Sequence, residues 1–262
     1  MSPAQQTGNP APQTGGTASP TSDWVRRYHP RPDPAARLVC LPHAGGAATY
    51  FHPVSRMIGP AHEVLAIQYP GRQERRLEPC VDSVTELADL VAAELKPWLD
   101  RPLYLFGHSM GASVAFEVAR RLEAAGTAPA ALFVSGRRAP SRVRDEGVHR
   151  LDDAGLIAEI RRLDGSDTRV LDDDEMLRAV LPAIRADYKA AETYRCPEDV
   201  VVRAPIHAHL GLQDPRVPTE EAQAWNLHTT GAFELTTYPG GHFYLNQQAP
   251  ALVRAIEAVM SA

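Results

Sequence analysis

A serine stands at the centre of the segment that is most suggestive of chemistry. The run Gly107-His108-Ser109-Met110-Gly111 matches the pattern G-x-S-x-G, and it lies between an apolar stretch at 103–106 and a helical pattern from residue 110. In such a strand–turn–helix context the glycines permit a sharp turn, and the serine hydroxyl is exposed at the end of the strand. A bare five-residue match is frequent by chance, so this context carries the prediction that Ser109 is a nucleophile.

A serine hydroxyl needs a base, and His242 is the predicted one. In enzymes with this turn the chain order is serine, acid, histidine. His242 follows a predicted strand ending at Tyr238, and it comes directly after Gly240 and Gly241, which leave the backbone free to present the ring. We predict His242 as the general base. His207 and His209 alternate within a predicted strand, so we expect their rings to pack against the sheet.

Asp214 is the predicted acid that orients the imidazole. It follows the apolar run 206–210, and the alternative position two residues earlier holds Leu212, so it has no near competitor. Such a carboxylate fixes the histidine tautomer and stabilises the imidazolium. The alternative is that Asp214-Pro215 is a structural turn.

An oxyanion hole requires two backbone N–H donors. The residue after the nucleophile, Met110, supplies the first, and the loop 42–46 after the predicted strand 37–41 supplies the second. In that loop Ala44 is the expected donor, because its glycine neighbours permit close backbone approach. We expect His43 to support this loop rather than to act as a second base.

The elements that must position these residues read as an α/β protein. Short, nearly continuous apolar runs alternate with helical patterns, as parallel strands buried on both faces require. The predicted strands are 37–41, 63–67, 103–106, 131–134, 206–210 and 233–238; the helical patterns are 47–58, 83–96, 110–125, 219–227 and 248–260. With the serine turn, this predicts an α/β-hydrolase fold, a mostly parallel central sheet flanked by helices.

One stretch breaks the alternation and predicts an inserted helical lid at about 145–200. Two helix-period patterns occur there with no convincing strand, around Leu156–Leu163 and Leu177–Tyr188. The alternative is an ordinary crossover with an extra helix. Residues 1–22 are polar and rich in Pro, Gly and Thr, so we expect a disordered tail followed by one domain at 23–262.

Composition excludes several classes of protein. The 262 residues carry a net charge of -5, which argues against nucleic acid as the main partner. No apolar run reaches the roughly 18 residues of a membrane helix, and the N-terminus does not read as a secretory signal. Three widely spaced cysteines make neither a disulfide framework nor a zinc pattern, so we expect no metal and a cytoplasmic protein.

Several segments together resemble the type II, or editing, thioesterases of polyketide and nonribosomal peptide biosynthesis. The resemblance spans about 24–260 and includes the serine turn and the histidine segment. The other matching segments are Leu41–Gly46, Tyr69–Arg75, Ser135–Pro140, Arg185–Tyr188 and Asp214-Pro215. It implies a stand-alone hydrolase of antibiotic biosynthesis that removes aberrant or stalled acyl groups from the phosphopantetheine arm of acyl or peptidyl carrier proteins.

The resemblance also implies residue roles. Ser109, Asp214 and His242 would be the triad, and Ala44 and Met110 would supply the oxyanion hole. The helices at 145–200 would cover the acyl chamber. No cofactor is implied beyond the phosphopantetheine that the partner carries, and we expect a monomer.

Arginines gather in two of the resembling segments, which predicts a basic rim for an acidic carrier protein or the arm's phosphate. The candidates are Arg72, Arg75, Arg76, Arg137 and Arg138. The alternative is a solvated face of an arginine-rich protein.

Two other functions compete with carrier-bound thioester hydrolysis. One is a small-molecule serine esterase or peptidase, because the same fold hosts many substrates. The other is a catalytically silent module that binds carrier proteins, which a complete triad disfavours.

Overall fold

A seven-stranded sheet forms the centre of the molecule, in the order β1-β3-β2-β4-β5-β6-β7. This computed structural model describes residues 22–144, 146–163 and 174–262. The strands are β1 Val25–Arg26, β2 Ala36–Leu41, β3 His62–Ile67, β4 Leu103–His108, β5 Ala131–Ser135, β6 Ile206–Gly211 and β7 Phe233–Tyr238. All neighbouring strands pair in parallel except β1, which runs antiparallel to β3.

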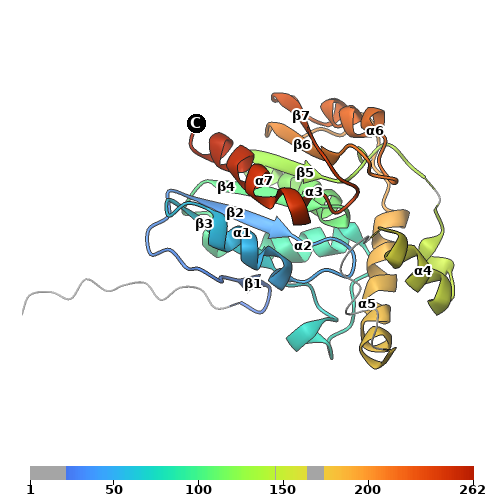
Figure 1. Cartoon of the computed structure of the whole chain (residues 1–262). Helices are drawn as coiled ribbons and strands as arrows, with labels where there is room; N and C mark the ends of the chain where they lie inside the picture. Colours follow the sequence, from blue (N-terminus) through green and yellow to red (C-terminus); the bar gives the residue numbers. More distant parts are fainter. Residues whose placement is uncertain (1–21, 145, 164–173) are drawn as a thin grey trace, which may run out of the picture.

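Helices cover both faces of this sheet (Figure 1). They are α1 His52–Met57, α2 Val84–Leu95, α3 Met110–Ala124, α4 Asp153–Leu163, α5 Asp174–Thr193, α6 Thr219–Gln223 and α7 Leu245–Met260. Helices α2 and α3 pack on one face, whereas α1 and α7 pack on the other. The expected α/β-hydrolase architecture is therefore confirmed.

Strand β2 shows why the strand sequences read as continuous apolar runs. Val39 and Leu41 point to the layer of α2 and α3, and Leu38 and Cys40 point to the layer of α1 and α7. All four side chains are fully buried. Each large apolar side chain buried in this way contributes about 1.5–3 kcal/mol, so both faces of the strand must be apolar.

The carboxyl ends of β4, β6 and β7 meet at one edge of the sheet. His108 at the end of β4 pairs in register with Ser135, and Gly211 at the end of β6 pairs with Tyr238. The loops that carry the three predicted triad residues start from this edge. Helices α4 and α5 lie beyond the same edge, at the right of Figure 1.

The described residues of the inserted segment between β5 and β6 include two α-helices, as the periodicity of the segment predicts. Helix α4 begins at Asp153 and α5 ends at Thr193, within the expected range of 145–200, of which residues 145 and 164–173 lie outside the described residues. The predicted tail 1–22 also lies outside them, apart from Ser22, which donates to Glu94 of α2 at 2.6 Å. The two-residue strand β1 was not predicted, because a pair of residues carries no periodicity.

Candidate active site

Ser109 sits on a strained turn between β4 and α3. Its backbone has φ 54° and ψ −120°, a conformation that costs a non-glycine residue about 1–3 kcal/mol. The turn is held because the Ser109 N–H donates to the Ser135 carbonyl of β5 at 2.8 Å. The strain projects the hydroxyl away from the sheet, as a nucleophile requires.

The two glycines of this turn are fixed by sterics. A Cβ at Gly107 would lie 2.1 Å from the Gly111 carbonyl oxygen, and a Cβ at Gly111 would lie 2.1 Å from the carbonyl oxygen of Leu41 on β2. Real Cβ atoms do not approach other atoms so closely. The close approach of α3 to β4 and β2 therefore admits only glycine at these two positions.

The structure brings Ser109, His242 and Asp214 into one hydrogen-bonded chain. His242 Nε2 lies 3.0 Å from Ser109 Oγ, and His242 Nδ1 lies 2.8 Å from Asp214 Oδ2. The Asp214 side chain is fully buried, and that of His242 is only 4% exposed. With Asp214 as a carboxylate, Nδ1–H donates to it, and Nε2 is left to accept the serine proton.

A backbone contact holds Asp214 in place from its other oxygen. The N–H of Arg216 donates to Asp214 Oδ1 at 2.8 Å, while Oδ2 accepts from His242. The Asp214 and His242 loops also touch closely, since a Cβ at Gly211 would lie 2.2 Å from the Gly241 carbonyl oxygen. Both carboxylate oxygens and both loops are thus restrained before substrate binds.

Two of the N–H groups in the loop at 43–46 already have acceptors. Gly45 N–H donates to Asp187 of α5 at 2.7 Å, and Gly46 N–H donates to the His43 carbonyl at 2.9 Å. Among the described residues, the N–H groups of Ala44 and Met110 have no hydrogen-bond acceptor. These are the two predicted oxyanion donors, and both residues line the same cavity as Ser109.

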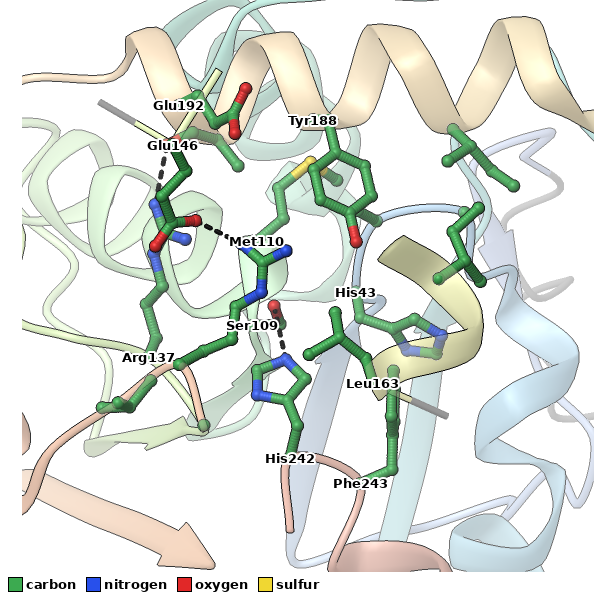
Figure 2. Close-up of a pocket in the computed structure, with 18 of the residues that line it drawn as sticks. His43, Ser109, Met110, Arg137, Glu146, Leu163, Tyr188, Glu192, His242 and Phe243 are labelled. Atoms are coloured by element: carbon green, nitrogen blue, oxygen red, sulfur yellow. Dashed lines mark hydrogen bonds and ion pairs between the residues drawn. The ribbon is translucent and has the colours of Figure 1, made fainter. Parts of the chain in front are cut away.

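A cavity of about 280 Å³ opens above the serine. Its apolar wall comes from both inserted helices, Ile160 and Leu163 of α4 with Val180 and Ile184 of α5. Figure 2 shows Tyr188 pointing from α5 into the cavity above the Ser109–His242 pair. Charged side chains, among them Arg137, Glu146 and Glu192, also line the cavity (Figure 2), and the apolar wall from the two inserted helices suits an acyl chain.

The model of the thioesterase domain matches residues 36–260. The chain belongs to this thioesterase family. It is a serine hydrolase of the α/β-hydrolase fold.

Relatives similar to this chain over most of its length are also named thioesterases. Thioesterase PikA5 of Streptomyces venezuelae is 56% identical over 227 residues, which cover 86% of this chain and 81% of that protein. The probable cadicidin biosynthesis thioesterase of Streptomyces griseus is 51% identical over 229 residues, 87% of this chain and 63% of that protein. The solved structure of the type II thioesterase BorB from the borrelidin biosynthetic cluster has a TM-score of 0.87 at 49% identity, covering 92% of this chain and 99% of that one.

Two buried histidines near His242 have lowered pKa values. Burial, with His242 and Arg72 nearby, lowers the pKa of His43 from 6.5 to about 3. Burial, with His242 and His43 nearby, lowers the pKa of His108 well below 6.5. The His108 and His242 ring centroids are 5.1 Å apart. His43 is therefore unsuited as a second base near neutral pH, as its place in the loop suggested.

Three of the five arginines of the expected basic rim form ion pairs within the molecule. Arg72 forms a buried ion pair with Asp187, and Arg75 binds Glu78 and lies over the Trp24 ring at 4.4 Å. Arg138 is 6% exposed. It pairs with acids of neighbouring segments, Glu146 and Glu221. The guanidinium groups of all three are thus paired with carboxylates of this chain, and Arg138 also lines the cavity at the serine.

The other two arginines have different surroundings. Arg76 is exposed to solvent. Arg137 lines the cavity, donating to Ser113 Oγ at 3.1 Å and to the Ala191 carbonyl at 2.7 Å. Burial, with Arg138 nearby, lowers the pKa of Arg137 from 12.5 to about 10, so it remains a cation at neutral pH.

Two site residues were missed by the sequence analysis, Arg216 and Asp187. Arg216 forms ion pairs with Glu159 of α4 and with Glu146, which precedes that helix. These pairs connect the loop of Asp214 to α4 and to the segment before it. Asp187 binds the loop at 43–46 from α5. Asp187 lies within the resembling segment Arg185–Tyr188, and Arg216 directly follows Asp214-Pro215. The local sequence does not show which distant group such a charged side chain contacts.

No candidate metal cluster occurs among the residues that the structure describes. In the same part of the chain, no helix is both long and apolar enough to span a membrane.

Proposed function

We propose that this thioesterase hydrolyses acyl groups from the phosphopantetheine arm of acyl or peptidyl carrier proteins, with Ser109, His242 and Asp214 as its triad. The observation that carries the proposal is the serine–histidine–aspartate chain at the base of an apolar cavity. The names of the relatives support the pathway class, since they include a type II thioesterase from the borrelidin biosynthetic cluster and a probable cadicidin biosynthesis thioesterase. The role is editing in trans, the removal of aberrant or stalled acyl groups.

The reaction proceeds in two steps. Ser109 Oγ attacks the thioester carbonyl carbon while His242 Nε2 takes its proton, and the resulting oxyanion accepts hydrogen bonds from Ala44 and Met110. When the C–S bond breaks, the thiolate leaves with the proton from His242. Water, deprotonated by His242, then attacks the acyl-serine, and Ser109 regains its proton as the free acid departs. Asp214 stabilises the imidazolium in both steps.

Contacts to the arm are proposed for the two arginines outside the internal ion pairs. Arg137 lies at the cavity wall as a half-buried cation, and its guanidinium donates to two uncharged partners, Ser113 Oγ and the Ala191 carbonyl. We assign it to a polar or anionic group of the phosphopantetheine arm. Arg76 is a surface contact for an acidic carrier protein.

The chemistry needs no cofactor of its own, because the partner carries the phosphopantetheine. We further infer a monomer that works in the cytoplasm. The free state of Cys40, Cys80 and Cys196 is consistent with a reducing compartment.

The test presents one acyl group in three ways to the wild type and to Ser109→Ala. The acyl group is offered on a holo carrier protein, on a pantetheine thiol and as an oxygen ester. Ser109-dependent turnover that strongly favours the carrier supports the proposal. Equal or better turnover of the oxygen ester would make the protein a general esterase. Carrier binding without any turnover would make it a silent binding module.

A further inference from the structure

Asp187 is a fully buried carboxylate on α5 with no part in the proposed proton transfers. Its Oδ2 accepts from the Gly45 N–H at 2.7 Å and from Arg72 Nη1 at 2.6 Å, and its Oδ1 accepts from Arg72 Nη2 at 2.9 Å. A buried carboxylate is costly unless donors surround it, and here donors from two segments do so. The three segments that meet at Asp187 are the inserted helix, the Arg72 loop and the loop after β2.

Arg72 holds the loop after β2 a second time. Its Nη1 also donates to the Gly46 carbonyl at 3.0 Å. The Arg72–Asp187 pair thus binds two successive residues, the N–H of Gly45 and the carbonyl of Gly46. Both contacts lie within two residues of Ala44.

Packing of α5 fixes the same loop sterically. Gly45 has φ +77°, and a Cβ placed on it would lie 2.8 Å from Ile184 Cγ1. Ile184 lies three residues before Asp187, a spacing that places both side chains on the same face of α5. Both side chains therefore reach the loop from that face. The helix and the loop are therefore packed with no space for an intervening group.

These contacts decide which N–H of the loop is available to a substrate. Asp187 occupies the Gly45 N–H, and the His43 carbonyl occupies the Gly46 N–H. The Ala44 N–H has no acceptor among the described residues, and it belongs to the peptide immediately before the one that Asp187 holds. If the Asp187 contact is lost, the loop can rotate and the geometry of that donor changes.

We propose that Asp187 and Arg72 are positioning residues for the oxyanion hole, so that α5 sets the catalytic loop as well as lining the acyl chamber. This inference rests on the proposed function, in which Ala44 stabilises the oxyanion. Oxyanion donors act when they are held in place before charge develops. The pair should therefore contribute to the transition state much more than to substrate binding.

The experiment compares Asp187→Asn and Arg72→Lys with a matched control, Lys189→Gln. Asparagine preserves the size of Asp187 but has only one acceptor oxygen. In the wild type the Gly45 N–H and the Arg72 guanidinium share two carboxylate oxygens. Lysine preserves the charge of Arg72 but loses the paired contact. Lys189 lies on the same helix and also ties it to the body, through exposed Asp82, away from the loop after β2.

The readouts separate positioning from folding. Active sites are counted by titrating Ser109 to completion with a fluorophosphonate, and kcat per active site and KM are measured with an acyl-pantetheine thioester. Inhibition by an alkyl trifluoromethyl ketone, whose serine adduct carries an oxyanion, reports on the hole directly. We expect kcat for Asp187→Asn to fall about 10- to 100-fold and the inhibition constant to rise in parallel. KM should stay within about threefold, and Lys189→Gln should match the wild type.

Two results would overturn the inference. The first is that Asp187→Asn has the same kcat per active site and the same inhibition constant as the wild type. The other is a loss that Lys189→Gln shares, which would mark a general effect of loosening α5. If Asp187→Asn does not fold, Arg72→Lys carries the same test. Full hydrolysis by Ser109→Ala would refute the proposed function itself, a result distinguishable from failure of this inference.

Discussion

At the scale of single residues, the proposed chemistry depends on proton transfer between Ser109 and His242, with Asp214 orienting the imidazole and stabilising the imidazolium. Spacing along the chain was sufficient to select these three residues, because each follows a predicted strand at the same edge of a parallel sheet. The structure places them at hydrogen-bond distances of 3.0 and 2.8 Å.

Asp214→Asn tests the orienting role of the acid. The amide cannot hold the same imidazole tautomer, so we expect kcat to fall about 10⁴-fold with folding preserved. The control is Glu234→Gln, which breaks another histidine–carboxylate pair, with His207 at 3.5 Å on the outside of the sheet. Acyl-pantetheine hydrolysis is the measurement. A fall of less than tenfold would show that Asp214 is a structural turn residue.

The partners of charged side chains could not be read from the sequence. Arg72 and Arg76 lie four residues apart in one segment, yet the first is buried against Asp187 and the second is exposed. The difference comes from a helix 115 residues further along the chain. A cluster of arginines therefore predicts positive charge but not an accessible surface.

At the scale of elements, strands and helices of the core were largely predictable, since their apolar periods are strong. Strand β4 extends to His108 rather than ending at residue 106, because the first two residues of the serine turn still pair with β5. The apolar period of the inserted helices predicted that they exist. It did not predict which residues connect them to the rest of the molecule. Arg216 ties α4 to the triad loop, and Asp187 ties α5 to the loop after β2.

The lining of the cavity by α4 predicts a change in chain-length preference. Ile160→Trp should fill part of the chamber, so hydrolysis of long acyl-pantetheine thioesters should fall about tenfold or more relative to acetyl-pantetheine. Leu151→Trp is the control, since Leu151 lies just before α4, is exposed and does not line the cavity. Equal effects on short and long chains, measured as kcat/KM, would contradict the assignment of the cavity to the acyl chain.

At the scale of the whole molecule, buried histidines make stability depend on pH. His209 in the sheet is 4% exposed, and burial, with His207 nearby, lowers its pKa from 6.5 to about 3. The unfolded chain binds a proton at this site near pH 6.5, whereas the folded chain does so only near pH 3. The stabilising difference is therefore present above pH 6.5 and is lost progressively as pH falls toward 3.

His209→Gln tests this linkage. Between pH 6.5 and 4.5 the wild type should lose about 2–3 kcal/mol of unfolding free energy through His209, and the variant should lack that part of the loss. Urea unfolding at the two pH values measures it. The exposed His52→Gln is the control and should keep the wild-type loss. An acid loss unchanged in His209→Gln would show that this histidine does not stay neutral in the folded protein.

The most direct test is to measure the release of an acyl group from a holo carrier protein. The loss of the acyl group is detected as a fall in the mass of the carrier. Ser109→Ala should lower the rate by about 10⁴-fold or more relative to the wild type. The matched control is Ser55→Ala, which removes another buried serine hydroxyl that lies 3.1 Å from a histidine ring nitrogen, that of His29, outside the cavity. It should release acyl groups at the wild-type rate. Undiminished release by Ser109→Ala would contradict the nucleophile, and with it the mechanism built on this turn.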